Sequence, residues 1–277
     1  MNNFILKIDC DDEKGLVFKI ANEIFKQGLN IVSNNEFVDS NNKRFYFLAT
    51  LDSEGTSFDK AKLANNLQDI LPNANIYLDK KRTKNIVIFA TKETHCLGDI
   101  LLAEYAKELD INIKMIIANH DLSDLANRFN KDFKLIKALD DRAKYEQLMK
   151  DELAKIEFDY IVLAKYMRIL SKDFVDTYKD KIINIHHSFL PAFIGANPYL
   201  QAYNRGVKII GASAHFVTSN LDEGPIIYQD IVRIDHSMSV NELRNAGRKI
   251  ETLVLRCALE KVFDDRVFIN NNKTIIF

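Results

Sequence analysis

The first eighty residues alternate between short apolar runs and longer segments whose apolar positions recur at helical spacing. The apolar runs predict strands at residues 4–10, 30–40, 43–52 and 75–79. The helical periodicity predicts helices at residues 14–28 and 57–71. Strands and helices in this order form the ferredoxin-like βαββαβ pattern, so the sequence predicts a small α/β domain over residues 1–80.

A polar stretch at residues 81–84 is typical of a linker, and the pattern changes after it. Four apolar runs predict strands at residues 85–90, 112–118, 134–139 and 160–164, with helical spacing between them at 96–110 and 142–156. This alternation predicts a mostly parallel, Rossmann-like sheet with helices on both faces, in a second α/β domain over residues 85–277. No glycine-rich dinucleotide or phosphate motif follows these strands, so we expect no nucleotide cofactor.

The pattern loosens in the last third of the chain. Three of the four prolines and four of the nine glycines lie between Pro191 and Pro225. These prolines and glycines predict a long loop region with defined turns and with strand-like inserts at 209–218 and 224–234. An amphipathic helix at residues 239–263 and a hairpin at 266–277 are expected to complete the domain.

Composition narrows the class of protein. A length of 277 residues suits two domains, and a net charge of −1 argues against nucleic acid or an anionic membrane as a partner. The apolar runs are shorter than a membrane span, and we see no signal peptide. Cys10, Cys96 and Cys257 are widely separated, which favours reduced thiols, so we expect a cytoplasmic protein.

Polar side chains gather where the strand "INIHH", residues 183–187, is expected to end. Asn184 and His186 are two residues apart, so on a strand both point to the same side and both can reach one oxygen atom. Asp222 lies in the predicted turn "NLDEGP", where Gly224 and Pro225 favour a tight bend. An amide and a protonated imidazole can stabilise an oxyanion while a carboxylate manages protons, which is the chemistry of acyl transfer or hydrolysis.

Other interpretations of these residues stay open at this point. A histidine at a strand end is often a hydrogen-bonded structural residue, and "LDEG" is an ordinary turn sequence. A metal site is a second alternative, with the ligand set His186, His187, His215 and Asp222. Adjacent histidines on a strand point to opposite faces, which weakens that alternative. Ser188 lacks the G-x-S-x-G elbow that a serine nucleophile of the hydrolase type would need.

The blocks "NIHHSFLPAFIGANPY" and "GVKIIGASAHFVTSNLDEGPIIYQD" closely resemble the formyltransferase fold that uses formyltetrahydrofolate, and within it the deformylases. The resemblance covers the whole chain. It implies catalytic roles for Asn184, His186 and Asp222, with His187 and His215 in support. It also implies a folate-binding set, which is Met167, Arg168, Ile169, Leu170 and Gly195. The reaction implied is hydrolysis of 10-formyltetrahydrofolate to formate and tetrahydrofolate, without a metal or other cofactor, in support of purine synthesis and one-carbon balance.

Two alternative functions remain beside this one. Transferases with this site typically read "NIHPS", whereas this chain has His187 in the proline position, as in deformylases. Formyl transfer to an amine such as glycinamide ribonucleotide needs room for the acceptor, and hydrolysis needs that room closed. The second alternative is an inactive folate or amino-acid sensor, which an intact set of Asn184, His186 and Asp222 argues against.

The N-terminal unit, with "KGLV" and "GLNIV", resembles an ACT domain, a regulatory module that often binds amino acids. The resemblance implies an amino-acid effector near Gly15, Leu29 and Asn30, and a homo-oligomer. Asp11 stands where deformylases usually carry a proline, so the shape of this loop departs from the family pattern.

Overall fold

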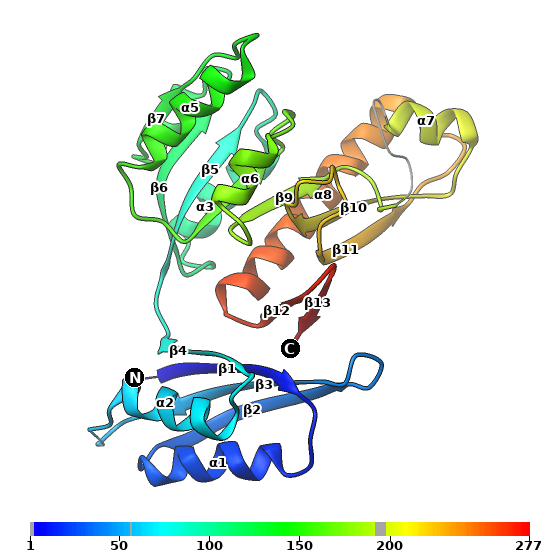
Figure 1. Ribbon diagram of the computed structural model, residues 1–277. Helices are drawn as coiled ribbons and strands as arrows, with labels where there is room; N and C mark the ends of the chain where they lie inside the picture. Colours follow the sequence, from blue (N-terminus) through cyan, green and yellow to red (C-terminus); the bar gives the residue numbers. More distant parts are fainter. Residues whose placement is uncertain (1–2, 56, 192–197) are drawn as a thin grey trace. The chain divides into compact units, whose positions relative to one another are not determined.

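The computed structural model describes residues 3–55, 57–191 and 198–277. The chain divides into two compact units, one that ends at Arg82 and one from Thr83 to Ile276 (Figure 1). Each unit has its own sheet and its own buried apolar core.

The first unit has the expected βαββαβ order. Its elements are β1 (Asn3–Asp11), α1 (Leu16–Lys26), β2 (Asn30–Asp39), β3 (Arg44–Asp52), α2 (Lys60–Ile70) and β4 (Asn75–Lys80). The strands form an antiparallel sheet in the order β2-β3-β1-β4. One core joins alternate residues of β1 and β3 to the apolar stripes of both helices, such as Ile20 of α1 and Leu63 of α2. This packing gives the helices their stability, because short isolated helices are marginal in water.

The second unit is built on a seven-stranded sheet in the order β11-β10-β9-β8-β5-β6-β7. Its strands are β5 (Lys84–Ala90), β6 (Ile111–Ala118), β7 (Phe133–Leu135), β8 (Tyr160–Ala164), β9 (Ile182–His186), β10 (Ile209–Phe216) and β11 (Ile226–Arg233). The five strands from β9 to β7 are parallel, and β10 and β11 are antiparallel to their neighbours. A separate hairpin pairs β12 (Val267–Asn270) with β13 (Lys273–Ile276).

Helices cover both faces of this sheet (Figure 1). The helices are α3 (His95–Tyr105), α4 (Ser123–Arg128), α5 (Arg142–Leu153), α6 (Lys172–Thr177), α7 (Pro198–Arg205) and α8 (Val240–Phe263). One core cluster lies under α3, α4 and α8, and another lies under α5 and α6. Both faces of the central strands are therefore buried, which explains their continuous apolar sequences. Within the described residues, no helix is both long and apolar enough to cross a membrane.

The path of the chain creates a switch point between two central strands. From β5 the chain moves to β6 and β7 on one side, and then returns to place β8 on the other side of β5. In open α/β sheets, the crevice at the carboxyl ends of two such strands is the usual ligand-binding position. The carboxyl ends of β5 and β8 are at Ala90 and Ala164.

The short helices α4 and α6 were not predicted from the sequence, and helix α3 ends at Tyr105, before the predicted end at residue 110. Three further differences have a local physical reason. Strand β7 has only three residues, instead of 134–139, because pairing with β6 stops at Leu135 and Ile136 turns into the core under α5. Strand β5 begins at Lys84, within the predicted linker. Helix α7 lies inside the predicted loop region, where Pro198 occupies its first turn, a position that proline tolerates because no intrahelical N–H bond is lost there.

Candidate active site

Asn184 and His215 face each other across two neighbouring strands. Strands β9 and β10 are antiparallel, and their register places these two residues directly opposite each other. The His215 ring donates from Nδ1 to the Phe216 carbonyl oxygen at 2.8 Å, so its Nε2 is an acceptor for Asn184 Nδ2 at 3.3 Å. This contact fixes the orientation of the Asn184 amide and leaves the second N–H of Nδ2 for a bound oxygen.

Asp222 lies between the two histidines of this site. Its Oδ2 is 3.4 Å from Nδ1 of His186, and its Oδ1 is 3.7 Å from Nε2 of His215. Asp222 has a φ of 56°, a left-handed conformation that few side chains adopt readily. A Cβ at Gly224 would lie 1.8 Å from the Phe216 carbonyl oxygen, so the turn can approach β10 this closely only with glycine there. The strained turn therefore places Asp222 against the strand ends.

The carboxyl group of Asp222 stays ionised. Burial acts to raise its pKa, but the hydrogen bond and charge of the His186 ring act against burial, and the pKa lies well below its ordinary value. A carboxylate this close to Nδ1 of His186 stabilises a positive charge on that ring. The same low pKa makes Asp222 a weak base, so it suits a role as counter-charge and hydrogen-bond acceptor better than one as a strong proton acceptor.

The opposite edge of the His186 ring carries a free hydrogen-bonding position. Its Nε2 is buried and has no hydrogen-bond partner among the described residues. Buried polar atoms of native proteins nearly always have a partner, so an orphan in a site points to a group that binds there. His186 Nε2 and the second N–H of Asn184 are thus two donors available to one ligand oxygen.

One cavity joins these residues to the segment "MRIL". Its volume is about 340 Å³. Its lining includes the predicted residues Met167, Arg168, Ile169, Leu170, Asn184, His186, His187, His215 and Asp222. The side chains of Met167 and Ile169 are exposed and offer apolar surface to a planar ligand, and the Arg168 guanidinium lies 4.8 Å from the centre of the Tyr145 ring. Residues that the sequence placed in separate catalytic and binding groups therefore share one cavity.

His187 follows the last residue of β9 and lies beside the His186 ring, with the ring centres 4.9 Å apart. Burial, and next the charge of Lys165, lower the pKa of His187 from 6.5 to about 4. His187 is therefore uncharged at neutral pH, and its ring forms one wall of the cavity.

Other predicted residues are not brought to this site. Gly195 lies outside the described residues. Gly15 precedes α1, and Leu29 and Asn30 follow it, so an eleven-residue helix about 16 Å long separates them. Within one copy of the first unit, these three residues do not form a single effector site. The sequence analysis expected no metal site, and the four residues of the alternative metal set, His186, His187, His215 and Asp222, are not a group with metal-ligand spacing among the described residues. In the described part of the chain, the group with that spacing is His95, Cys96 and Glu251.

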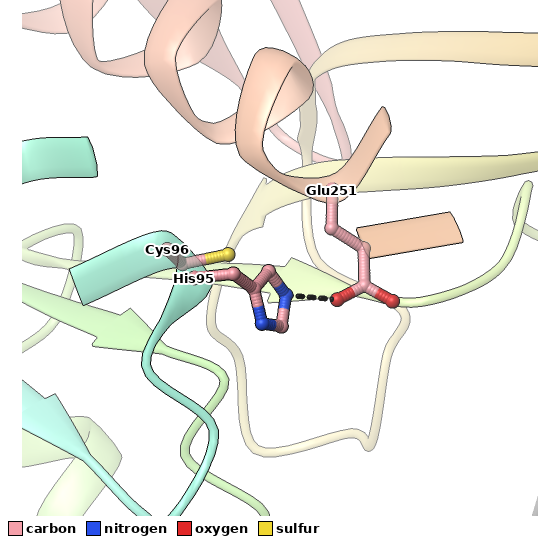
Figure 2. Close-up of side chains that lie close together, drawn as sticks. All are labelled: His95, Cys96 and Glu251. Atoms are coloured by element: carbon pink, nitrogen blue, oxygen red, sulfur yellow. Dashed lines mark hydrogen bonds and ion pairs between the residues drawn. The ribbon is translucent and has the colours of Figure 1, made fainter. Parts of the chain in front are cut away.

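The sequence analysis missed a buried charged network that involves this second group. Glu251 of α8 has a side chain only 1% exposed, and it accepts from Lys165 Nζ at 2.9 Å and from His95 Nε2 at 2.7 Å. Tyr199 also donates to Glu251. Figure 2 shows the His95 ring directed at the Glu251 carboxylate, with Cys96 on the same turn of α3. The available signal was a carboxylate on the apolar stripe of α8, between Gly247 and Val254.

Comparison with known proteins agrees with this geometry. The Formyl transferase family matches residues 84–259. A formyltetrahydrofolate deformylase of Haemophilus influenzae is 48% identical over 275 residues, which cover 98% of each chain. The chain belongs to the formyltetrahydrofolate deformylase family.

Solved structures place the deformylase family within a wider fold. A crystal structure of a formyltetrahydrofolate deformylase from Pseudomonas syringae has a TM-score of 0.96 at 33% identity, over 100% of this chain and 95% of that one. A glycinamide ribonucleotide transformylase from Symbiobacterium toebii matches 73% of this chain and 98% of its own, with a TM-score of 0.67 and 26% identity. The deformylase family therefore shares a large part of its structure with a protein named for formylating an amine-bearing ribonucleotide.

Proposed function

We propose that this protein hydrolyses 10-formyltetrahydrofolate to formate and tetrahydrofolate. The observation that carries the proposal is the single cavity that joins Asn184, His186 and Asp222 to the folate-binding segment at residues 167–170. The names of its relatives, formyltetrahydrofolate deformylases that match nearly the whole chain, support the same reaction.

In this proposal the pteridine ring lies against residues 167–170, where exposed apolar side chains and an arginine supply a flat surface and a donor. The formyl group then points towards the ends of β9 and β10. Asn184 Nδ2 and His186 Nε2 donate to the formyl oxygen, which becomes negative as the carbonyl carbon turns tetrahedral. Donors that are fixed before the reaction stabilise this charge without reorganisation.

Asp222 has two tasks in this mechanism. Its carboxylate lies 3.4 Å from His186 Nδ1, where it stabilises positive charge that develops on that ring, and it accepts a hydrogen bond from the attacking water. The water oxygen bonds to the formyl carbon, and the bond from that carbon to nitrogen 10 of the folate breaks. Nitrogen 10 takes up one proton, passed from the attacking water by way of Asp222 or a second water, and the other proton is released when formic acid ionises to formate. The proposed reaction uses no metal or nucleotide.

Replacement of each oxyanion donor tests the mechanism. Asn184→Ala and His186→Ala should each lower kcat by about 10²–10³-fold and change KM little, because both donors act mainly on the developing charge. Asn112→Ala and His236→Ala remove the same residue types at exposed positions of the second unit and should behave as wild type. A rise in KM with kcat intact would reassign the mutated residue to substrate binding and refute its proposed role.

A direct assay separates hydrolysis from the two alternative functions. Purified protein should release formate from 10-formyltetrahydrofolate with no amine present. Formyl transfer to glycinamide ribonucleotide without formate release would favour a transferase, and binding of folate without turnover would favour a sensor. The buried His186 ring and the ionised Asp222 favour catalysis over simple binding, since a sensor needs no aligned oxyanion donors.

We place the reaction in the cytoplasm, where the formate supplies purine synthesis and balances one-carbon folates. Cys10, Cys96 and Cys257 are unpaired, which suits a reducing compartment.

For the first unit we propose an amino-acid effector and association into a homo-oligomer. Phe18 and Phe25 of α1 are 73% and 78% exposed, and β2 is an edge strand with further exposed apolar residues such as Val32. Edge strands and exposed apolar helix faces favour pairing with a second copy. An effector site shared by two copies would unite residues from the opposite ends of α1. Sedimentation analysis with and without candidate amino acids tests both parts of this proposal.

A further inference from the structure

The crevice at the switch point of the large sheet holds buried protein side chains. Lys165 follows the last residue of β8, and His95 begins α3, the helix that follows β5. Glu251 of α8 joins them through the two hydrogen bonds given above, and Tyr199 of α7 adds a third. Side chains from four elements thus meet at the carboxyl ends of β5 and β8, where folds of this kind usually bind a ligand. We call these four residues the crevice network.

The backbone is adapted to build the crevice network. Lys165 has a φ of 62°, in the left-handed region that lysine rarely adopts, and its side chain is only 10% exposed. Gly247 lies one helical turn before Glu251, and a Cβ there would come within 2.1 Å of the Tyr199 hydroxyl. Glycine therefore lets the Tyr199 ring rest against α8 with its hydroxyl at the carboxylate. Strained conformations such as that of Lys165, and glycines at close contacts such as Gly247, occur where the position of a neighbouring group depends on them.

The crevice network is electrostatically complete as it stands. Burial acts to raise the pKa of Glu251, but hydrogen bonds and the lysine charge outweigh burial and hold the pKa at about 2. His95, Cys96 and Glu251 have the spacing of metal ligands, yet the Lys165 ammonium already neutralises Glu251. A salt bridge therefore explains this group without an ion.

The crevice network borders the catalytic cavity at His187. The His187 ring lines the cavity on one side, and its centre lies 6.3 Å from the centre of the Tyr199 ring on the other. A second space, of about 80 Å³, is lined by His187, Tyr199 and Ser188, whose buried hydroxyl has no hydrogen-bond partner among the described residues. Each molecule in liquid water occupies about 30 Å³, so this space can hold a few water molecules and is far too small for a ribonucleotide.

We propose that the crevice network occupies the position of a formyl acceptor, so that water is the nucleophile that reaches the formyl carbon. The inference rests on the proposed hydrolysis, and it names Lys165, Glu251, His95 and Tyr199 as the residues that set acceptor specificity. The folate fills the cavity beside residues 167–170, so an acceptor must approach from another side. A relative in this fold is named for acting on glycinamide ribonucleotide, and in this protein side chains fill the crevice that the fold offers.

Opening the crevice network should therefore admit an amine. In that reaction the amine nitrogen bonds to the formyl carbon, the bond from the formyl carbon to nitrogen 10 breaks, and a proton moves from the amine to nitrogen 10. Glycinamide is a suitable probe, because it carries the amine without the ribonucleotide. Total tetrahydrofolate, formate and N-formylglycinamide are measured together, and their balance gives the ratio of transfer to hydrolysis.

Two variants open the crevice network in different ways. Tyr199→Ala removes an aromatic ring and keeps the ion pair, whereas Lys165→Ala with Glu251→Ala removes both charged side chains together and leaves neither member of the pair unpaired. The matched control is Lys84→Ala with Asp265→Ala, which removes another buried pair, 2.7 Å apart, at the amino end of β5. We expect the ratio of transfer to hydrolysis to rise about tenfold or more in the first two proteins, the usual effect of opening a pocket. The control should keep the wild-type ratio.

Each result has a definite meaning. An unchanged ratio in a folded Tyr199→Ala protein that still releases formate would overturn the inference, and this variant decides the matter if the double variant does not fold. Wild-type protein that formylates glycinamide as readily as it releases formate would also overturn it. So would loss of formate release on chelation with recovery on adding zinc, since an ion would then hold Glu251. Wild-type protein that releases no formate would instead refute the proposed hydrolysis.

Discussion

Replacing Asp222 by asparagine removes one negative charge and changes almost nothing in shape. The Asp222→Asn protein should fold as wild type does, because the turn conformation, the approach of Gly224 and the neighbouring strand pairing do not depend on the charge. Its turnover should fall sharply. The His186 ring then loses the carboxylate that stabilises its positive charge, and the attacking water loses its acceptor.

The size of this effect follows from the geometry. Asp222 Oδ2 is 3.4 Å from His186 Nδ1, and the Asp222 side chain is 15% exposed. Two unit charges about 4 Å apart attract by about 4 kcal/mol at an effective dielectric constant of about 20. Since about 1.4 kcal/mol is a factor of ten in rate, loss of the full attraction corresponds to about 10³-fold. Partial solvent screening and the usual range for proton-handling groups set our expectation at about 10²–10³-fold.

The assay is steady-state formate release, with KM measured in parallel and thermal unfolding recorded for each protein. Because the pKa of Asp222 lies well below its ordinary value, its charge is constant from about pH 6 to about pH 8, so titration of Asp222 itself adds no pH dependence to the wild-type assay in this window. Asp235→Asn, an exposed position in the same unit, is the matched control. Turnover of Asp222→Asn within about threefold of wild type would remove Asp222 from the mechanism.

Three further changes have definite expected outcomes. Folding lowers the pKa of His187 from 6.5 to about 4, so protonation of His187 opposes folding and the free energy of unfolding falls as the pH drops from 6.5 to about 4. His187→Asn removes this titration, so urea titrations near pH 4 should show that the variant recovers at most about 3 kcal/mol of unfolding free energy. Gly224→Ala puts a Cβ 1.8 Å from the Phe216 carbonyl oxygen, so the turn must shift and kcat should fall about 10²-fold. The control Gly98→Ala, which has open space around its new Cβ, should keep wild-type activity. Equal activity of the two variants would show that the turn can move without effect on the reaction. A chain that starts at Thr83 should unfold cooperatively and release formate without any response to amino acids; failure to fold would show that the two units depend on each other.

The sequence could indicate that Asn184, His186 and Asp222 belong to one candidate site, because their signals are local. Asn184 and His186 alternate on one strand, and Asp222 lies in a turn whose glycine has a steric reason. The crevice network could not be found this way. Lys165 and Glu251 are 86 residues apart in the chain, and only the packing of α8 on the sheet brings them together. A lysine after a strand or a glutamate in an amphipathic helix is ordinarily a solvated residue.

The same limit explains the errors in the secondary structure. The apolar run 134–139 has the pattern of a full strand, but β7 pairs with β6 through only three residues, and Ile136 packs in the core. Helix α7 begins at a proline within a proline-rich and glycine-rich stretch, where local propensity favours a loop. Tertiary contacts, which the sequence pattern does not encode locally, decided both outcomes.

The backbone of the turn that carries Asp222 is hydrogen-bonded to the sheet at its base. Phe216 N donates to the Pro225 carbonyl at 2.9 Å, and Val217 N donates to the Ile182 carbonyl at 2.9 Å. Asn184 and His186, in contrast, belong to a strand paired on both sides. Local opening of residues 218–224 should therefore need less energy than melting of the sheet. On heating, the enzyme should lose activity before it loses its far-ultraviolet circular dichroism, and the amides of this turn should exchange with deuterium sooner than those of β9.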